Sequence, residues 1–459
     1  MFRTIFSYMA VFFLVFLCLK SNASAGYDFV VSKDGQGNFE NIQAAIDAVP
    51  SGNTKPFRIF VRSGYYFEKV SVPATKNLVQ LIGEDASSTI ILFGDGIGGT
   101  CVFTINADDF MMMNITVENT QGRISDGPQS LAIKANADRI VFFYCRFISG
   151  QDTILVNKAR NRCYFQDCYI DGNTDFIYGA AIAVFERCIV FARDRVDGRK
   201  GGYITAASTP AGQEFGLVFR NCSIPDNHGI TKYSLGRPWQ NDSDTELKGR
   251  TRAENKVVFI HTKMGMNIKP QGWSLWNDGT QTQKILFAEY KTINFEGKAQ
   301  QFSERLKWSK QLDSVQAAKY MIDELIFDGW SPKKYWTELN QPVLAKLTIA
   351  NLLVRKIDGR LVLQFNSSWP TKEGSFRLYA TNNPDKRFKK VDKLSVSQAS
   401  KVSYEFYLDP KVIDSAIYLK IKATNPGRAY TCETLFLNPA KVLKTKNGFK
   451  VSQEEPRLR

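Results

Sequence analysis

Two aspartates, Asp152 in GQDTI and Asp175 in TDFIYG, lie among apolar and aromatic residues, where an isolated carboxylate is costly to bury. Two carboxyl groups that lie close together do not both ionise easily, so one keeps its proton near neutral pH while the other is charged. Such a pair supplies a general acid together with a nucleophile or base. Taken alone, the pair is equally compatible with a solvated aspartate ladder on a protein surface.

A repeat in the surrounding sequence predicts how the two acids meet. Short segments rich in Val, Ile, Phe and Tyr recur without helical periodicity, and Gly, Asn and Asp separate them. Four of them, VFFYCRF, CYFQDCYI, AVFERCIV and LVFRNCSI, carry a cysteine at matching points: Cys145, Cys168, Cys188 and Cys222. FMMMNITV is expected to place Asn114 at the same point one repeat earlier. This pattern is typical of a parallel β-helix.

The repeat also sets the phase of the polar residues. Asp152 lies seven residues after Cys145, and Asp175 lies seven after Cys168, so both acids are expected at the same phase of successive coils. Counting back from Asp152 by the interval between the two acids reaches Gln129. We therefore expect Gln129, Asp152 and Asp175 to form a polar ladder, because neighbouring strands are roughly 4.7 to 4.9 Å apart. The cysteines are expected to stack as interior thiols, with disulfides as the alternative.

The segments around this ladder resemble the pectin methylesterases (pectinesterases). The resemblance covers roughly residues 27 to 335 and includes NITVENT, QSLAIKA, GQDTI, DCYIDGNTDFIYG, GYITAAST, LGRPW and KPQGWSLW. Each motif alone is weakly specific, whereas their joint order and spacing are highly specific. The resemblance implies an all-β fold built on a right-handed parallel β-helix, as the repeat also predicts.

The resemblance implies a role for each polar residue of the site. Asp175 matches the nucleophile that attacks the methyl ester carbonyl of a galacturonate unit, and Asp152 matches the general acid and base. Gln129 and Gln151 match residues that donate amide N–H groups to the oxyanion. Gln151 would point to the opposite face of a straight strand, so its role depends on the resemblance alone. Arg237 matches the arginine that holds the nucleophile, and we expect it to lower that aspartate's pKa.

Aromatic residues are expected along the substrate cleft. Trp239 and Trp273 match aromatic positions there, although a core position is an equal alternative for Trp273. Tyr178, where the family more often has Phe, is expected to line the same groove. Leu155 stands where the motif usually carries Tyr, and Lys134 replaces a usual Arg. These changes affect the expected sugar contacts and leave the chemistry intact.

Other functions fit the sequence less well. A pectate lyase would need a calcium-binding acid cluster beside a basic proton acceptor, and a lyase or a polygalacturonase would leave LGRPW unexplained. An inactive polysaccharide-binding β-helix is disfavoured because the acid pair, Gln129 and Arg237 are all intact. A serine hydrolase is disfavoured because neither His228 nor His261, the two histidines of the chain, accompanies a nucleophile-elbow motif. Without metal-ligand spacing, we predict no metal and no other cofactor.

The two ends of the chain predict further regions. Residues 1–25 read as a secretory signal peptide, with Arg3, an apolar run and a small-residue cleavage site. We therefore expect secretion, either extracellular or periplasmic, and no later segment is long and apolar enough to span a bilayer. Residues 26–340 are assigned to the catalytic β-helix. Alternating strands in 341–440 predict a small β-sandwich of fibronectin type III-like or immunoglobulin-like type, followed by a basic tail at 441–459.

Positive charge is concentrated in the C-terminal part. Residues 345–459 contain 22 Lys and Arg against 10 Asp and Glu, so this part holds +12 of the chain's +15. Two interpretations stay open: a soluble spacer with solvated lysines, or a module that binds acidic polysaccharide. We expect a monomer whose partner is methylesterified homogalacturonan, with no nucleic-acid partner.

Overall fold

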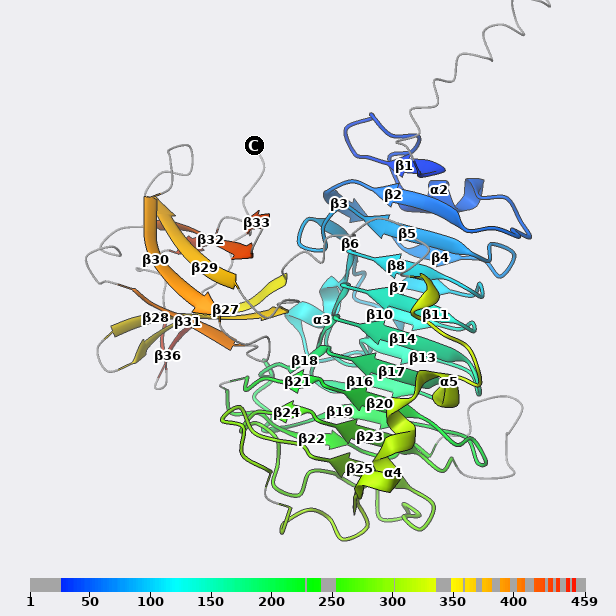
Figure 1. Cartoon of the computed structure of the whole chain (residues 1–459), viewed down its shortest axis with the longest axis vertical. Helices are drawn as coiled ribbons and strands as arrows, with labels where there is room; N and C mark the ends of the chain where they lie inside the picture. The colour runs from blue at the N-terminus through cyan, green and yellow to red at the C-terminus, as the bar shows by residue number, and fades with distance from the viewer. Residues whose placement is uncertain are drawn as a thin grey trace, which may run out of the picture.

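The computed structural model describes residues 26–227, 229–240, 253–300 and 302–335, and the backbone of strands between 348 and 450. The predicted signal peptide, 1–25, lies outside the described residues. Figure 1 shows a stack of coils that runs from the N-terminal strands to β25, as predicted for a parallel β-helix. From the coil that begins with β2 to the coil that begins with β20, each coil adds one strand to each of three parallel sheets, here called sheets A, B and C.

The strands of each sheet pair in the order of the coils. Sheet A contains β1 (Phe29–Val31), β2 (Phe57–Val61), β5 (Val79–Gly83), β8 (Met111–Met113), β11 (Ile140–Phe143), β14 (Arg162–Gln166), β17 (Ile182–Glu186), β20 (Leu217–Arg220), β23 (Lys256–Ile260), β25 (Leu286–Tyr290) and β26 (Lys310–Gln311). Sheet B contains β3 (Gly64–Phe67), β6 (Thr89–Phe93), β9 (Thr116–Asn119), β12 (Arg146–Ile148), β15 (Tyr169–Gly172), β18 (Ile189–Ala192), β21 (Ser223–Ile224) and β24 (Lys263–Met264). Sheet C contains β4 (Val70–Val72), β7 (Thr100–Ile105), β10 (Ser130–Ala135), β13 (Ile154–Val156), β16 (Thr174–Gly179), β19 (Gly201–Ala207) and β22 (Lys232–Gly236).

The corner between sheets A and B is the same in six coils. Two residues separate the strands, and the first of them is left-handed, with φ between 49° and 54°: Asn114, Tyr144, Asp167, Arg187, Asn221 and His261. Pairing of Arg146 with Thr116 sets Tyr144 opposite Asn114. Asn114 therefore precedes the cysteine position by one residue, and Ile115 occupies it. The prediction for Asn114 was wrong because its polar side chain marks the left-handed corner, not the interior position that follows.

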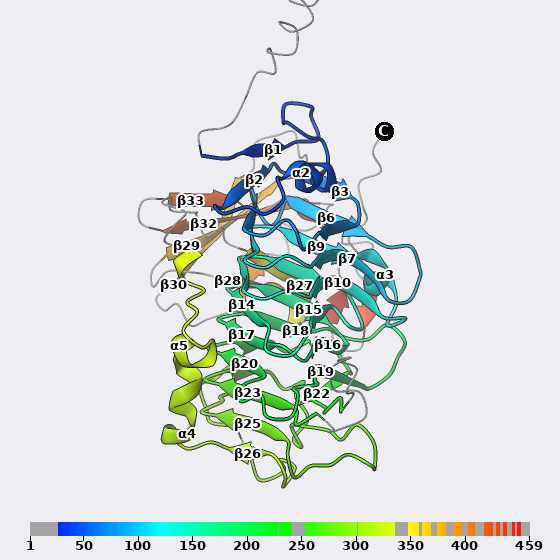
Figure 2. The ribbon, with the colours of Figure 1, turned by 90° about the vertical axis from the view of Figure 1, so that its right-hand side faces the viewer.

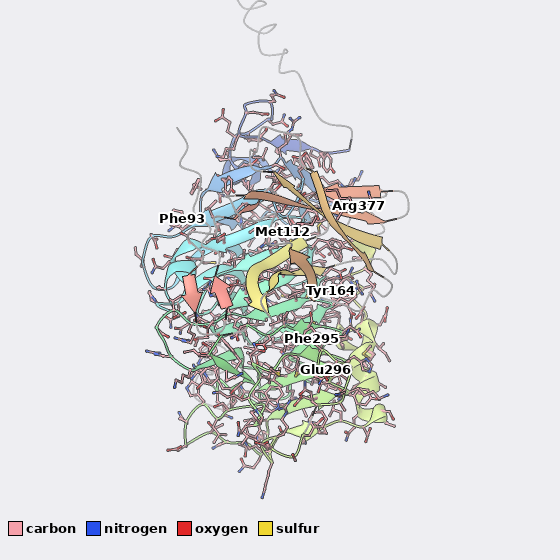
Figure 3. The ribbon with its side chains drawn as sticks, turned by 90° about the vertical axis from the view of Figure 1, so that its left-hand side faces the viewer. Phe93, Met112, Tyr164, Phe295, Glu296 and Arg377 are labelled. Atoms are coloured by element: carbon pink, nitrogen blue, oxygen red, sulfur yellow. The ribbon has the colours of Figure 1, made fainter. Side chains whose placement is uncertain are left out.

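The interior of the coils is a column of stacked side chains. Phenyl rings of successive sheet A strands stack with centroids 4.4 to 4.6 Å apart: Phe142, Phe165, Phe185, Phe219 and Phe259. Beside them, each thiol donates to a backbone oxygen of the preceding coil: Cys145, Cys168, Cys188 and Cys222. Met112 lies in the same core (Figure 3). All four thiols are free and buried, so the predicted cysteine ladder is confirmed.

Short helices cover the first coil and one outer face. α2 (Ile42–Ala48) buries Ile42, Ala45 and Ile46 against the first coil, as its apolar periodicity predicts. α4 (Ser314–Ala318), the 3₁₀ turn η1 (Lys319–Met321) and α5 (Asp323–Ile326) pack on the outside of sheet A, which Figure 2 shows beside β20 and β23. Arg220 of β20 anchors them through a 2.6 Å ion pair with Asp323. α3 (Thr120–Ile124) lies between β9 and β10.

The C-terminal strands pair with one another in antiparallel fashion, as a β-sandwich-like unit requires. One sheet contains β27 (Thr348–Ile357), β28 (Arg360–Ser368) and β31 (Ser403–Leu408). A second contains β29 (Gly374–Thr381), β30 (Lys389–Val396), β32 (Ile417–Asn425), β33 (Arg428–Thr431) and β34 (Leu435–Leu437), and β35 (Leu443–Thr445) pairs with β36 (Gly448–Lys450). Among the described residues, no helix is long and apolar enough to cross a membrane.

Candidate active site

Sheet C brings the two aspartates into register. Asp152 lies two residues before β13, and Asp175 is the second residue of β16. Gln151 pairs with Thr174, and Ile154 pairs with Ile177, so the same spacing along the chain holds on both sides of the aspartates. The predicted juxtaposition of Asp152 and Asp175 is therefore confirmed by the strand pairing. Both have left-handed backbones, with φ of 67° and 48°, a conformation that is uncommon outside glycine and often found at functional sites.

Arg237 holds the carboxylate of Asp175 through two hydrogen bonds. Its Nε donates to Oδ1 over 2.9 Å and its Nη2 to Oδ2 over 2.5 Å, the bidentate geometry that a guanidinium offers a carboxylate. Arg237 follows β22 directly, and its amide donates to the carbonyl of Thr205 in β19. The guanidinium carbon also lies 4.0 Å from the ring centroids of both Tyr203 and Trp276. This aromatic contact fixes the arginine and limits its access to water.

Their surroundings give the two aspartates different protonation states. Burial, and then the negative charge of Asp175, raises the pKa of Asp152 to about 7. Burial also raises the pKa of Asp175, against the effect of its bonds to Arg237. Arg237 lowers the pKa of Asp175, as expected, but burial outweighs the guanidinium, so the net pKa is raised. The two negative charges repel each other, and the bonds from Arg237 favour the charged form of Asp175, so Asp175 ionises first and Asp152 keeps its proton.

One of the two glutamines lies differently from the prediction. Ser130 donates to the carbonyl of Gln151, and Ile133 pairs with Ile154, so the coil from β10 to β13 is shorter than the coil that follows it. Leu131, not Gln129, is therefore level with Asp152. The predicted ladder was wrong at Gln129, whose side chain is exposed just before β10. Gln151 lies beside the acid pair: it directly precedes Asp152, and its side chain favours the charged form of Asp152, which lowers the pKa of that residue against the effect of burial.

The aromatic residues divide between a groove and the core. Tyr178 and Trp239 contact each other with ring centroids 5.7 Å apart. Trp239 and Trp276 line a surface pocket of about 690 Å³ together with Gln240 and residues 277–280. Trp273 is instead buried between Phe259 and Phe287, so its expected place in the cleft was wrong. The core position follows from its stacking on the phenyl column.

Lys134 and Leu155, the two positions at which this sequence departs from the family motifs, lie in one row of sheet C. Lys134 pairs with Leu155, and Leu155 pairs with Tyr178, so all three occupy one register position of successive coils. Leu155 contributes an apolar contact to the cluster that contains Tyr178 and Trp239.

Several supporting residues were not identified from the sequence. Arg195 donates to the hydroxyl of Thr174, the residue before Asp175, and is itself held by Asp197 through bonds of 3.0 and 2.7 Å. Asp126 accepts hydrogen bonds from the side-chain amide of Asn173 and the backbone amide of Asp197, and so joins the loop before β10 to the same network. Tyr203 and Trp276 were also missed, although both stand in the quoted motifs GYITAAST and KPQGWSLW. Among the described residues, no group of three or more His, Cys, Asp or Glu is placed to hold a metal ion.

Comparisons with known proteins agree with this fold. The family model named Pectinesterase matches residues 28–329. Putative pectinesterase 11 of Arabidopsis thaliana is 32% identical over 300 residues, which cover 64% of this chain and 78% of that protein. The solved pectin methylesterase from carrot is 25% identical with a TM-score of 0.61, and the match covers 70% of this chain and 98% of the carrot chain. A pectin methylesterase from Erwinia chrysanthemi is 28% identical with a TM-score of 0.56, covering 67% and 98%. This chain belongs to the pectinesterase family.

Proposed function

We propose that this chain hydrolyses the methyl esters of pectin to methanol and de-esterified galacturonate, with Asp175 as nucleophile and Asp152 as general acid and base. The observation that carries the proposal is the acid pair. An ionised Asp175, held by Arg237, lies one coil from a carboxyl group whose pKa is about 7. Relatives support the substrate class, since one solved pectin methylesterase is described in complex with a hexasaccharide.

The mechanism follows from the protonation states of the two acids. A carboxylate oxygen of Asp175 attacks the ester carbonyl, and the amides of Gln151 and Gln129 are the candidate donors to the oxyanion that forms. Asp152 then gives its proton to the leaving methoxyl oxygen, which departs as methanol and leaves an acyl-enzyme on Asp175. In the second half, ionised Asp152 takes a proton from the attacking water, and collapse of the intermediate releases the galacturonate carboxyl and restores Asp175.

The first test compares three kinds of product from highly methylated pectin. We expect methanol to be released without new reducing ends and without unsaturated products, because the acid pair is placed for ester hydrolysis. Methanol oxidation, a reducing-end assay and ultraviolet absorbance measure the three products separately. New reducing ends would point to a glycoside hydrolase and unsaturated products to a lyase. Binding without any product would leave a polysaccharide-binding protein.

The setting of the reaction is part of the proposal. Secretion toward cell-wall pectin fits the predicted signal peptide in residues 1–25, and the monomeric state remains a prediction. The domain limits at residues 340 and 440 remain predictions.

The basic C-terminal part is proposed to hold the enzyme near its own anionic product. Its charge of +12 would attract partly de-esterified pectin and raise the local concentration of the remaining esters. β30 alone contributes Lys389, Lys390 and Lys393.

We expect the full chain to bind immobilised de-esterified pectin at low salt and to elute as salt rises, because the Debye length shrinks to about 3 Å at 1 M. The triple change of Lys389, Lys390 and Lys393 to Gln should lower the salt concentration at elution. A matched triple change of exposed lysines on the β-helix, Lys284, Lys291 and Lys298, should lower it less. Equal shifts in the two variants would leave the C-terminal part as a spacer.

A further inference from the structure

The outward face of sheet B carries an apolar cluster. Every second residue of β12, β15 and β18 belongs to the core of the coils. Because side chains alternate along a strand, the residues between them point outward, and four of these form one cluster: Ile148, Tyr169, Ile189 and Phe191. The first three are 3 to 8% exposed, and Phe191 is partly buried. Side chains that point out of the coils and are this little exposed are covered by another segment of the chain.

The described helices account for other parts of the stack. α2 packs on the first coil, α4 and α5 pack on the outside of sheet A, and α3 contacts β6 and β10. The C-terminal strands lie on the side of sheet B. Figure 1 shows β27 and β28 beside the part of the stack where β6 and β18 are labelled, and Figure 3, viewed from that side, shows the C-terminal strands in front of the coils.

The path of the chain agrees with this position. The helical segment on sheet A ends at Tyr335, whose hydroxyl donates to Asp109 over 2.7 Å. Asp109 lies two residues before β8, and the corner after β8 leads into β9 of sheet B. Residues 336–347 connect Tyr335 to β27 and span at most roughly 40 Å, several times the length of the three-residue strand β8. This peptide is therefore long enough to carry β27 around sheet A to sheet B.

Charge also matches the C-terminal strands to this face. Glu118 of β9 pairs with Ile148, and Ile148 pairs with Asp171, so both carboxylates share the outward row of Ile148. They are 7% and 9% exposed, and a carboxylate is costly to bury unless cations or hydrogen-bond donors surround it. Asp171 has Arg193 within 3.6 Å. The C-terminal part, which holds +12 of the chain's charge, is suited to cover such a row.

We propose that the outward face of sheet B is a domain interface, on which the C-terminal strands β27 to β34 dock within the same chain. The apolar cluster supplies buried area, and the two carboxylates favour a basic partner. Domains joined by a small polar interface move freely, whereas an apolar interface restrains them. The C-terminal unit is therefore held in a fixed position beside the coils. This inference does not depend on the proposed reaction, because sheet B carries none of the proposed catalytic residues.

A photoreactive residue within the interface tests the contact in the full chain. Benzoylphenylalanine in place of Phe191 should link to peptides from residues 348–450 on illumination. The same residue in place of Val315 of α4, which is 82% exposed on the side of sheet A, is the control. It should give a yield about tenfold lower, because docking raises the local concentration of the C-terminal strands only at sheet B. Equal yields from the two positions would overturn the proposal, as would links from position 191 to a second copy of the chain.

A charged substitution in the cluster should release the C-terminal unit. Ile189→Asp places a carboxylate beside Tyr169, where burial is costly. We expect the radius of gyration in small-angle scattering to increase and the cross-link yield from position 191 to fall by about tenfold or more.

Two controls accompany this variant. Ile189→Val should keep the parent's radius of gyration and cross-link yield, and Val315→Asp, which adds the same charge elsewhere, should change neither. Methanol release by Ile189→Asp should stay close to that of the parent, because the acid pair belongs to sheet C. The comparison of positions 191 and 315 leaves Ile189 intact, so it decides the question even if Ile189→Asp does not fold. A folded Ile189→Asp with the parent's radius of gyration and cross-link yield would show that the C-terminal strands do not dock on this face.

Discussion

Replacing Asp175 with Asn is expected to lower methanol release by about 10⁵-fold or more, the scale on which hydrolases lose turnover without their nucleophile. The amide cannot form the acyl-enzyme, and no neighbouring group takes its place, because Asp152 keeps its proton until about pH 7. The same change weakens the bonds to Arg237, a largely buried guanidinium, but it also removes the buried charge whose cost raises the pKa of Asp175, so we expect the free energy of unfolding to change little.

The control for this variant is a second bidentate pair on the same coil. Arg187 binds Asp167 through Nε and Nη2 at 3.0 and 2.9 Å, so Asp167→Asn changes a similar carboxylate outside the site. Methanol release under initial-rate conditions and thermal unfolding of both variants separate chemistry from stability. If Asp175→Asn, correctly folded, released methanol at a rate close to that of Asp167→Asn, Asp175 would not be the nucleophile.

Asp152→Asn is expected to have opposite effects on activity and stability. Loss of proton transfer should reduce kcat by about 10² to 10⁴. The pKa of Asp152 is raised from its ordinary value to about 7, so the folded protein binds this proton more tightly than the unfolded chain does. Stability is therefore lost as pH rises from about 4 to 7, and above that window the full cost of the buried charge remains. Asparagine removes that cost, and we expect a gain of about 1 to 4 kcal/mol at pH 8.

Urea unfolding at pH 4 and pH 8 measures this effect directly. The difference in stability between Asp152→Asn and the parent protein should be small at pH 4 and largest at pH 8. Asp138→Asn is the contrasting control: although burial opposes it, hydrogen bonds from Arg162 lower the pKa of Asp138, so its loss should destabilise the protein at pH 8. A variant of Asp152 that is less stable than the parent at pH 8 would contradict the raised pKa.

Where neighbouring coils have the same length, the sequence correctly predicted which of their residues are in register. Asp152 and Asp175 are in register because the strand pairs around them repeat with the same spacing as the cysteine corners. The same spacing failed for Gln129, because the coil from β10 to β13 is shorter at sheet C. The shortening lies in the connections between strands, whose lengths the strand pattern does not set. Register across such a coil depends on where the extra or missing residues fall.

Burial was the other quantity that local sequence did not reveal. Trp273 and Trp276 stand three residues apart in one motif, yet the first packs on Phe259 in the core and the second covers Arg237. The net pKa of Asp175 likewise depends on how deeply the coil stack encloses it, which outweighs the arginine that the motif LGRPW predicted. The motifs identified single partners such as Arg237. How far solvent is excluded from a residue depends instead on the assembled coils.

The uniform corner between sheets A and B has a consequence for how this protein can diversify. Two residues make every such corner from β8 to β24, and a change of length there would displace the side chains stacked beside it. The connections that lead into sheet C vary instead, from one residue before β16 to eight before β19 and ten before β10. Insertions in the connections other than the one that carries Asp152 alter the walls around the acid pair without shifting its register. Selection can therefore change which methylation pattern of the polymer is recognised, while the reaction itself is inherited unchanged.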